Sequence, residues 1–135
     1  MKIKLKVTLC TDDWERLFGE GPYELLSGVQ ELGSLRASAQ RMGMAYTKAF
    51  HMVKHVETVL GVSLTQRTIG GRGGGGSTLT PEGQELLKRY EAYRAACEQA
   101  AHALYEQYLG DFIPLQGPDC TGKHNPERDT DHDDG

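Results

Sequence analysis

The chain has 135 residues, of which 38% are hydrophobic and 25% charged, a composition that fits one globular domain with a tail. No apolar run approaches the roughly 20 residues of a membrane span, and the alternating charged and apolar start from Met1 to Val7 does not fit a secretory signal peptide. Three cysteines far apart in the sequence favour a reducing, cytoplasmic setting over a disulfide framework.

The net charge of −4 is unevenly distributed along the chain. The residues from Gly117 onward carry six acids and two bases, so this tail alone accounts for the −4. By contrast, the segment from Ser34 to Arg72 holds six bases and one acid. A basic segment inside a neutral body predicts a surface that faces a polyanion, and a solvated face without a partner is the alternative on charge alone.

The N-terminal third predicts a β-hairpin followed by a helix. Apolar and polar residues alternate from Ile3 to Leu9, which indicates a half-buried strand, and Trp14–Phe18 can return as its partner. Pro22 suits the first turn of a helix that ends at Gly33. Its expected core face holds Leu25, Leu26, Val29 and Leu32.

Two further helices separated by a glycine predict a helix-turn-helix. Ser34 can cap a helix over Leu35–Met42, and Gly43 ends it. A longer helix is expected over Ala45–Leu60, where Gly61 stops it. Its expected buried stripe is Ala49, Val53, Val56 and Leu60.

In a helix-turn-helix the second helix enters the major groove of DNA and its N-terminal side chains meet base edges. Phe50 could touch a thymine methyl group or pack against a neighbour, and both interpretations stay open. Ser34 and Arg36 are placed for phosphate contacts at the start of the first helix. The full set of candidate DNA-binding residues is Ser34, Arg36, Tyr46, Thr47, Lys48, Phe50, His51, Lys54, Arg67 and Arg72.

The run of glycines between residues 70 and 76 matches two nucleotide-binding patterns, but both patterns need a helix directly after the glycines. Here Ser77–Leu79 intervenes as a strand that returns from Val62–Ile69. The run therefore predicts a wing, over about residues 69–77, in which Arg72 can reach a phosphate or a minor groove. With no nucleophile–base pair and no metal-ligand spacing, we expect no enzyme activity, no metal and no cofactor.

A last helix should begin at Pro81, capped by Thr80, and run to a break at Gly110. A helix of nearly thirty residues overhangs a small domain, so its apolar stripe needs a partner. We expect a homodimer, with an interface made by Leu86, Tyr90, Tyr93, Cys97, Ala100, Leu104 and Tyr108.

The motifs Gly33-Ser34-Leu35, Leu60-Gly61-Val62-Ser63-Leu64 and Leu79-Thr80-Pro81-Glu82-Gly83 resemble a LysR-type winged helix. The N-terminal hairpin and the wing sequence TIGGRGGGGSTLT make the chain more similar to the N-terminal domain of the molybdate-responsive transcriptional regulators (ModE). The resemblance covers about residues 1–110 and implies a cytoplasmic DNA-binding dimer. It departs from many relatives at Ala45, where they have a serine able to cap the helix.

The fold class expected is α+β, mainly α: a winged helix-turn-helix with an N-terminal β-hairpin and a long C-terminal dimerisation helix. The expected layout is a hairpin (1–20), the DNA-binding domain (21–80), the dimerisation helix (81–110) and a disordered acidic tail (111–135). In the full-length regulators a separate C-terminal module binds the oxyanion, and residues after Gly110 are too few and too polar to form one. We expect a transcriptional regulator that binds double-stranded DNA. The alternative is a protein-interaction module that works with a separate oxyanion-binding partner.

Overall fold

The structure is a computed structural model that describes residues 2–68 and 76–114. The chain forms two compact units, one of Lys6–Ala95 and one of Met1–Leu5 with Ala96–Gly135. Along the chain the elements are β1 (Leu9–Cys10), β2 (Arg16–Phe18), α1 (Glu20–Leu32), α2 (Leu35–Arg41), α3 (Tyr46–Leu60), β3 (Thr65–Thr68), β4 (Gly76–Leu79) and α4 (Pro81–Leu109). The expected mainly helical α+β class is confirmed.

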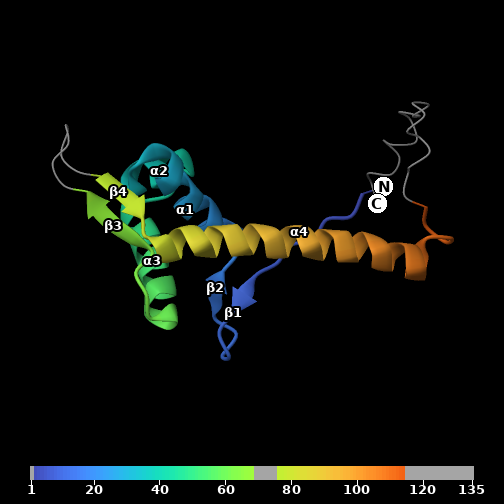
Figure 1. Cartoon of the computed structure of the whole chain (residues 1–135). Coiled ribbons are helices and arrows are strands. Elements are labelled where there is room, and N and C mark those ends of the chain that lie inside the picture. The colour runs from blue at the N-terminus through green and yellow to red at the C-terminus, as the bar shows by residue number, and fades with distance from the viewer. Residues whose placement is uncertain (1, 69–75, 115–135) are drawn as a thin grey trace. The chain divides into compact units, whose positions relative to one another are not determined.

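In the larger unit, α1, α2 and α3 pack against one another, and two antiparallel hairpins, β1–β2 and β3–β4, contact this helical group (Figure 1). The core draws on β2, the three helices, β4 and the start of α4. Its buried hydrophobic residues are Phe18, Leu25, Leu26, Val29, Leu35, Ala39, Ala49, Val53, Val56, Leu64, Leu79, Leu87 and Tyr90.

The helix ends follow the local sequence. Gly33 and Gly61 end α1 and α3 in the left-handed conformation, with φ of 71° and 73°. The Ser34 hydroxyl oxygen accepts a hydrogen bond from the amide of Ala37 at 2.9 Å and caps α2. Ala45 gives α3 no side-chain cap, as its lack of a hydroxyl requires.

Close approach of α1 to α2 depends on the absence of a side chain at Gly28. A Cβ atom there would lie 2.0 Å from the Oγ of Ser38. The same hydroxyl donates to the carbonyl oxygen of Leu25 at 2.7 Å, so this fully buried polar group is satisfied. The Gly28–Ser38 contact thus fixes the position of the helix-turn-helix on α1.

The first strand is much shorter than the alternation predicted, because only Leu9–Cys10 pairs and not Ile3–Leu9. Its partner β2 has three residues before α1 begins, so the earlier residues have no strand opposite them. Trp14 is also not part of the second strand. It lies in the turn with φ 66°.

Two expected core positions are wrong. Leu32 and Leu60 are each 45% exposed, since each is the last residue of its helix and has turned away from the core. The strand expected over Val62–Ile69 begins only at Thr65, because the turn after Gly61 extends to the buried Leu64. Ile69 itself lies outside the described residues.

The helix α4 has the 29 residues expected, and the Thr80 hydroxyl oxygen caps it by accepting from the amide of Gly83 at 3.0 Å. Its first half is built into the larger unit through an aromatic and ionic cluster. Arg94 pairs with Glu20 at 2.6 Å, and its guanidinium lies 4.7 Å from the ring centroid of Tyr23. The hydrogen bond to Glu20 raises the pKa of Arg94.

Tyr90, one of the residues expected at a dimer interface, is buried within its own chain. Its side chain is 3% exposed, its ring contacts Phe18 at a centroid distance of 5.1 Å, and its hydroxyl donates to the carbonyl oxygen of Val7 at 3.1 Å. Leu86, one turn before it, also packs against the core. Both side chains serve the fold of their own chain.

The outer part of the α4 stripe lies mainly in the smaller unit and is more accessible. Tyr93 is 49% exposed, Leu104 51% and Tyr108 70%. Cys97 is half-buried, and Ala100 is exposed. None of the helices in residues 2–68 and 76–114 is long and apolar enough to cross a membrane.

Candidate nucleic-acid interface

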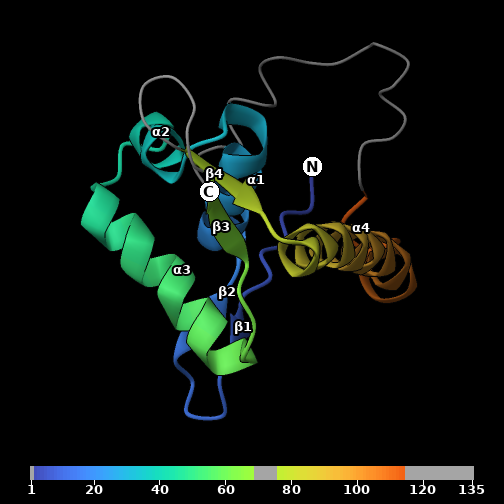
Figure 2. The same cartoon turned by 60° about the vertical axis from the view of Figure 1, so that its left-hand side comes forward.

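The outward face of α3 is the centre of the candidate interface. With about 100° of rotation per residue, the buried Ala49, Val53 and Val56 define the inner side of the helix. Thr47, His51, Lys54 and Thr58 lie on the opposite side, and all four are exposed. Figure 2 shows α3 along one side of the larger unit, with α2 at its N-terminal end.

Thr58 was missed by the sequence reasoning. It continues the spacing 47, 51, 54, 58 by four, three and four residues, so the helical period alone could have found it. The side chain is exposed one turn beyond Lys54. It extends the polar face of α3 toward the C-terminal end.

Aromatic side chains and two cations line one edge of this face. The Arg36 guanidinium of α2 lies 4.2 Å from the Tyr46 ring centroid, and the Tyr46 and Phe50 rings are 6.2 Å apart. The Lys54 ammonium follows at 5.6 Å from the Phe50 ring centroid. These cation–π and ring contacts hold Arg36 and Lys54 beside the outward face of α3.

Phe50 packs against its neighbours, which was one of the two alternatives that the sequence left open. It contacts Tyr46, His51 and Lys54 in its own helix, with the His51 ring 5.8 Å away. Yet it remains 39% exposed, so part of its ring is available to a ligand.

The only acid of the basic segment, Glu57, is turned inward. One carboxylate oxygen accepts from the amides of Leu64 at 2.7 Å and Thr65 at 3.4 Å, and the other pairs with Lys54 at 3.6 Å. Its side chain is only 13% exposed. Glu57 thus links α3 to the start of β3 and adds little negative charge to the outer surface.

Among the described residues of the basic segment, three cations carry no ion pair and can contact a ligand. Arg41 pairs with Glu31 at 2.8 Å, whereas Arg36, Lys48 and Arg67 have no ion pair within the described part of the chain. Lys48 lies about 100° around α3 from Thr47, at the far edge of the face from Tyr46. Arg72 falls outside the described residues.

The β3–β4 hairpin is fixed to the helices through backbone atoms. The amide of Ser77 donates to the carbonyl oxygen of Gly33 at 2.9 Å, which holds β4 to the turn between α1 and α2. β3 and β4 pair in regular register from Thr65 with Leu79 to Thr68 with Gly76. Arg67 is thereby presented on a strand whose position is set by the same turn that starts α2.

A three-helix core with a recognition helix and a β-hairpin after it defines a winged helix-turn-helix domain. Residues 23–84 match the family of bacterial regulatory helix-turn-helix proteins, lysR family. This part of the chain is therefore a LysR-type helix-turn-helix domain, as the sequence motifs indicated.

The chain is homologous to ModE and MopB proteins over much of its length. It is 30% identical over 102 residues to the transcriptional regulator ModE of Yersinia pestis, covering 75% of this chain and 37% of that protein. It is 30% identical over 91 residues to the DNA-binding transcriptional dual regulator ModE of Escherichia coli K12 (67% and 34%). It is 34% identical over 71 residues to the molybdenum-pterin-binding protein MopB of Rhodobacter capsulatus (53% and 26%). The chain spans about a third of the length of these relatives.

Proposed function

We propose that this chain is a sequence-specific DNA-binding transcriptional regulator. The recognition helix α3 would lie in the major groove, and the segment between β3 and β4 would follow the backbone or the minor groove. The observation that carries the proposal is the exposed polar face of α3, flanked by unneutralised cations, in a domain of the LysR type.

Each side chain has a role that its chemistry allows. Thr47 and His51 can hydrogen-bond to base edges near the N-terminal end of α3. Arg36, Lys48, Lys54 and Arg67 would contact phosphates, and Arg72 would do so from the wing. Ser34 uses its oxygen as the cap of α2, and its hydroxyl proton remains able to donate to a phosphate. Tyr46 and Phe50 would support this face and present ring edges to it.

The dimer is the second part of the proposal. The region 81–110 would associate with a second copy through Tyr93, Cys97, Ala100, Leu104 and Tyr108. The exposed fractions of Leu104 and Tyr108 support this, because a large apolar stripe on a helix gains free energy when a partner covers it. A symmetric pair would present two recognition helices to a palindromic site.

The remaining features follow from this function. We propose residues 1–20 as the N-terminal hairpin region, 21–80 as the DNA-binding domain and 111–135 as an acidic tail, in a protein of the cytoplasm without enzyme activity. The names of the relatives refer to molybdenum transport or molybdenum-pterin binding in addition to regulation. A separate oxyanion-binding partner is therefore a further candidate for the source of a signal.

The test begins with selection of bound duplexes from a random DNA library by the full chain. We expect a palindromic consensus, with half-sites about one helical turn apart. Fluorescence anisotropy on that site then compares Lys54→Ala with Lys88→Ala, an exposed lysine of α4 away from the proposed face. Lys54→Ala should reduce the salt slope by about one counterion, and Lys88→Ala should leave it unchanged.

Base-edge contacts are tested with Thr47→Val and His51→Ala on the same site. These changes should reduce the preference for the selected sequence over random DNA by roughly 1–3 kcal/mol per lost contact. Failure to select any consensus, or equal salt slopes for both lysine variants, would contradict the proposal and favour the protein-interaction alternative.

A further inference from the structure

The tip of the β1–β2 hairpin holds the only tryptophan of the chain in an unusual position. Trp14 is 85% exposed, and it is the single non-glycine residue with a positive φ, 66°, in the described ranges 2–68 and 76–114. A bulky side chain disfavours this left-handed conformation, and exposure of an indole to water is also unfavourable. Neither property serves the stability of the chain alone, which indicates a role in binding.

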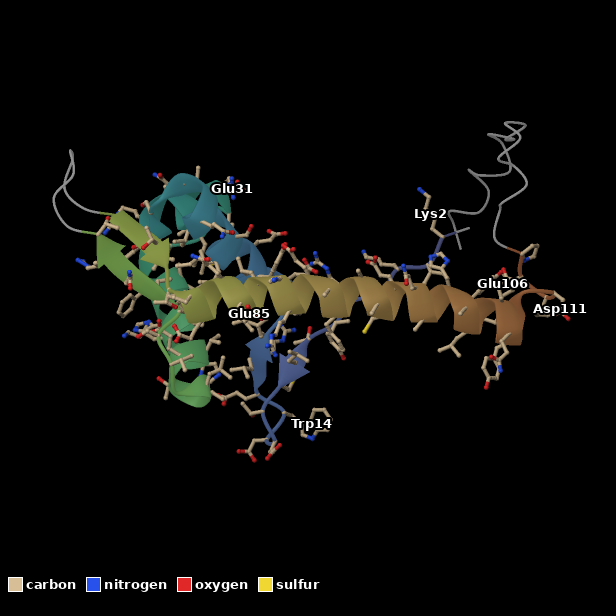
Figure 3. All side chains as sticks on the ribbon, in the orientation of Figure 1. Lys2, Trp14, Glu31, Glu85, Glu106 and Asp111 are labelled. Carbon is tan, nitrogen blue, oxygen red and sulfur yellow. The ribbon has the colours of Figure 1, made fainter. Side chains whose placement is uncertain are left out.

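The turn that carries Trp14 is held by four hydrogen bonds. The amide of Thr11 donates to the carbonyl oxygen of Glu15 at 2.9 Å, and the amide of Trp14 donates to the carbonyl oxygen of Thr11 at 2.9 Å. The Thr11 hydroxyl oxygen accepts from the amides of Asp13 and Glu15, both at 3.2 Å. The indole therefore projects from a preorganised turn, as Figure 3 shows for the labelled Trp14, and a partner would meet little ordering cost.

The charge around Trp14 selects the kind of partner. Asp12, Asp13 and Glu15 are all exposed and flank the indole, and Arg16 is the only base among residues 11–16. The tip thus has a net charge of −2, from three acids and one base. Such a surface repels the phosphates of DNA and attracts a cationic protein surface.

The C-terminal end of α3 adds apolar area and further negative character beside the tip. Glu15 and His55 lie close, with 4.0 Å between Oε1 and Nε2, so this end of α3 is next to the hairpin. One turn further along, Val59 is 46% exposed, and Val62 after the helix is 38% exposed. The last turn of α3 has no basic residue to offset the partial negative charge of the helix terminus.

We propose that this tip is a docking site for a protein partner that presents a linear segment combining large apolar residues with lysine and arginine side chains. Trp14 is the anchor that packs against the apolar residues, and Asp12, Asp13 and Glu15 pair with the cations. The site uses neither the outward face of α3 nor the β3–β4 hairpin, so it is independent of the proposed DNA contacts.

The test uses the full chain and a random library of displayed dodecamer peptides. Peptides are selected on the wild-type chain and depleted on Trp14→Ala, which should fold normally because the Trp14 side chain is 85% exposed. We expect the enriched sequences to combine lysine or arginine with large apolar residues. Synthetic copies should shift the Trp14 emission to the blue, because binding removes the indole from water.

Affinity measurements with these peptides quantify the two parts of the site. Trp14→Ala should raise the Kd roughly 30-fold, the effect of truncating an interface hot spot. Asp12→Asn, Asp13→Asn and Glu15→Gln should each raise it roughly two- to fivefold, as for exposed ion pairs. The matched control is the triple change Glu98→Gln, Glu106→Gln and Asp111→Asn in the smaller unit, which should leave the Kd unchanged.

Four outcomes would overturn the proposal. The first is that no peptide is enriched on the wild-type chain relative to Trp14→Ala. The second is enrichment of acidic or uncharged peptides, and the third is a shift of Trp14 emission with duplex DNA instead of peptide. The fourth is a concentration-dependent emission shift of the protein alone, which would mean that a second copy covers the tip.

Discussion

The two hairpins of the larger unit are attached to the helices in different ways. β1–β2 is held by side chains: the Phe18 ring packs against Tyr90, whose hydroxyl donates to the carbonyl oxygen of Val7. β3–β4 is held through its own backbone amides: that of Ser77 donates to the carbonyl oxygen of Gly33 at 2.9 Å, and that of Thr65 donates to the Glu57 carboxylate of α3 at 3.4 Å. Two-stranded hairpins are marginal in isolation, so each depends on its attachment.

The hairpins also differ in charge, which matches their proposed uses. The β1–β2 tip carries Asp12, Asp13 and Glu15, whereas β3 carries Arg67 and no acid lies in either β3 or β4. The backbone attachment of β3–β4 places it against the turn that starts the helix-turn-helix. The side-chain attachment of β1–β2 leaves its tip free to project, so one scaffold can present two surfaces of opposite charge.

The largest effect should come from removing the aromatic attachment of the first hairpin. Phe18→Ala should lower the free energy of unfolding by about 3–5 kcal/mol, because it opens a cavity beside Tyr90. Leu9→Ala, at the exposed position paired with Phe18, should cost about 1 kcal/mol or less. Urea unfolding of both variants measures this, and equal losses would show that the side-chain attachment is unimportant.

The second prediction tests the backbone attachment of β3–β4. A Cβ atom at Gly76 would lie 2.3 Å from the carbonyl oxygen of Gly33, so Gly76→Ala should destabilise the chain by about 1–3 kcal/mol. Gly21→Ala is the matched control, because the nearest atom to its Cβ would be the Met52 methyl group at 3.9 Å. In helix α1 this change should stabilise by roughly 0.5–1 kcal/mol. If urea unfolding showed that both variants change the free energy of unfolding in the same direction, the close approach of Gly76 to Gly33 would not matter for stability.

The third prediction concerns alkaline pH and the Tyr90 hydroxyl. Burial, followed by the charge of Glu20, raises the pKa of Tyr90 above 10.0, and the hydrogen bond to Glu91 raises that of Tyr23. The unfolded chain loses these protons first, so stability should be constant up to about pH 10 and fall as pH rises toward the folded pKa values.

Tyr90→Phe tests the same group at two pH values. At neutral pH this change should lower the free energy of unfolding by about 1 kcal/mol, the net contribution of the hydrogen bond to Val7. Above pH 10 it should reduce the alkaline fall, since one of the two tyrosines no longer titrates. An unchanged alkaline slope in thermal unfolding between pH 8 and pH 12 would contradict the role of Tyr90.

The smallest effect is a gain in stability at the tip of the first hairpin. Trp14→Asn should stabilise by about 0.5–1 kcal/mol, because asparagine adopts the left-handed conformation at lower cost. Trp14→Ala should stay within about 0.5 kcal/mol of the wild type, since alanine does not relieve this strain. Thermal unfolding distinguishes the two, and a loss of stability in Trp14→Asn would mean that the indole supports the fold.

Much of this protein was predictable because the signals are local in sequence. Gly33 and Gly61 end helices through their own backbone freedom, and the hydroxyls of Ser34 and Thr80 cap the next helix three residues away. The helical period predicted the buried Ala49, Val53 and Val56 of α3 but not the exposure of Leu60, and the glycine turn predicted where α3 begins. The candidate DNA-binding residues stay a prediction, and Arg72 lies outside the described residues.

The tertiary structure alone decided what depends on residues far apart in the chain. Tyr90 fits a dimer stripe by spacing, yet it packs against Phe18 and bonds to Val7, 83 residues away. The length of β1 was limited by its pairing with the three residues of β2. Sequence determined where helices begin and end because those hydrogen bonds are local, whereas burial and strand pairing depend on which distant surface each residue meets.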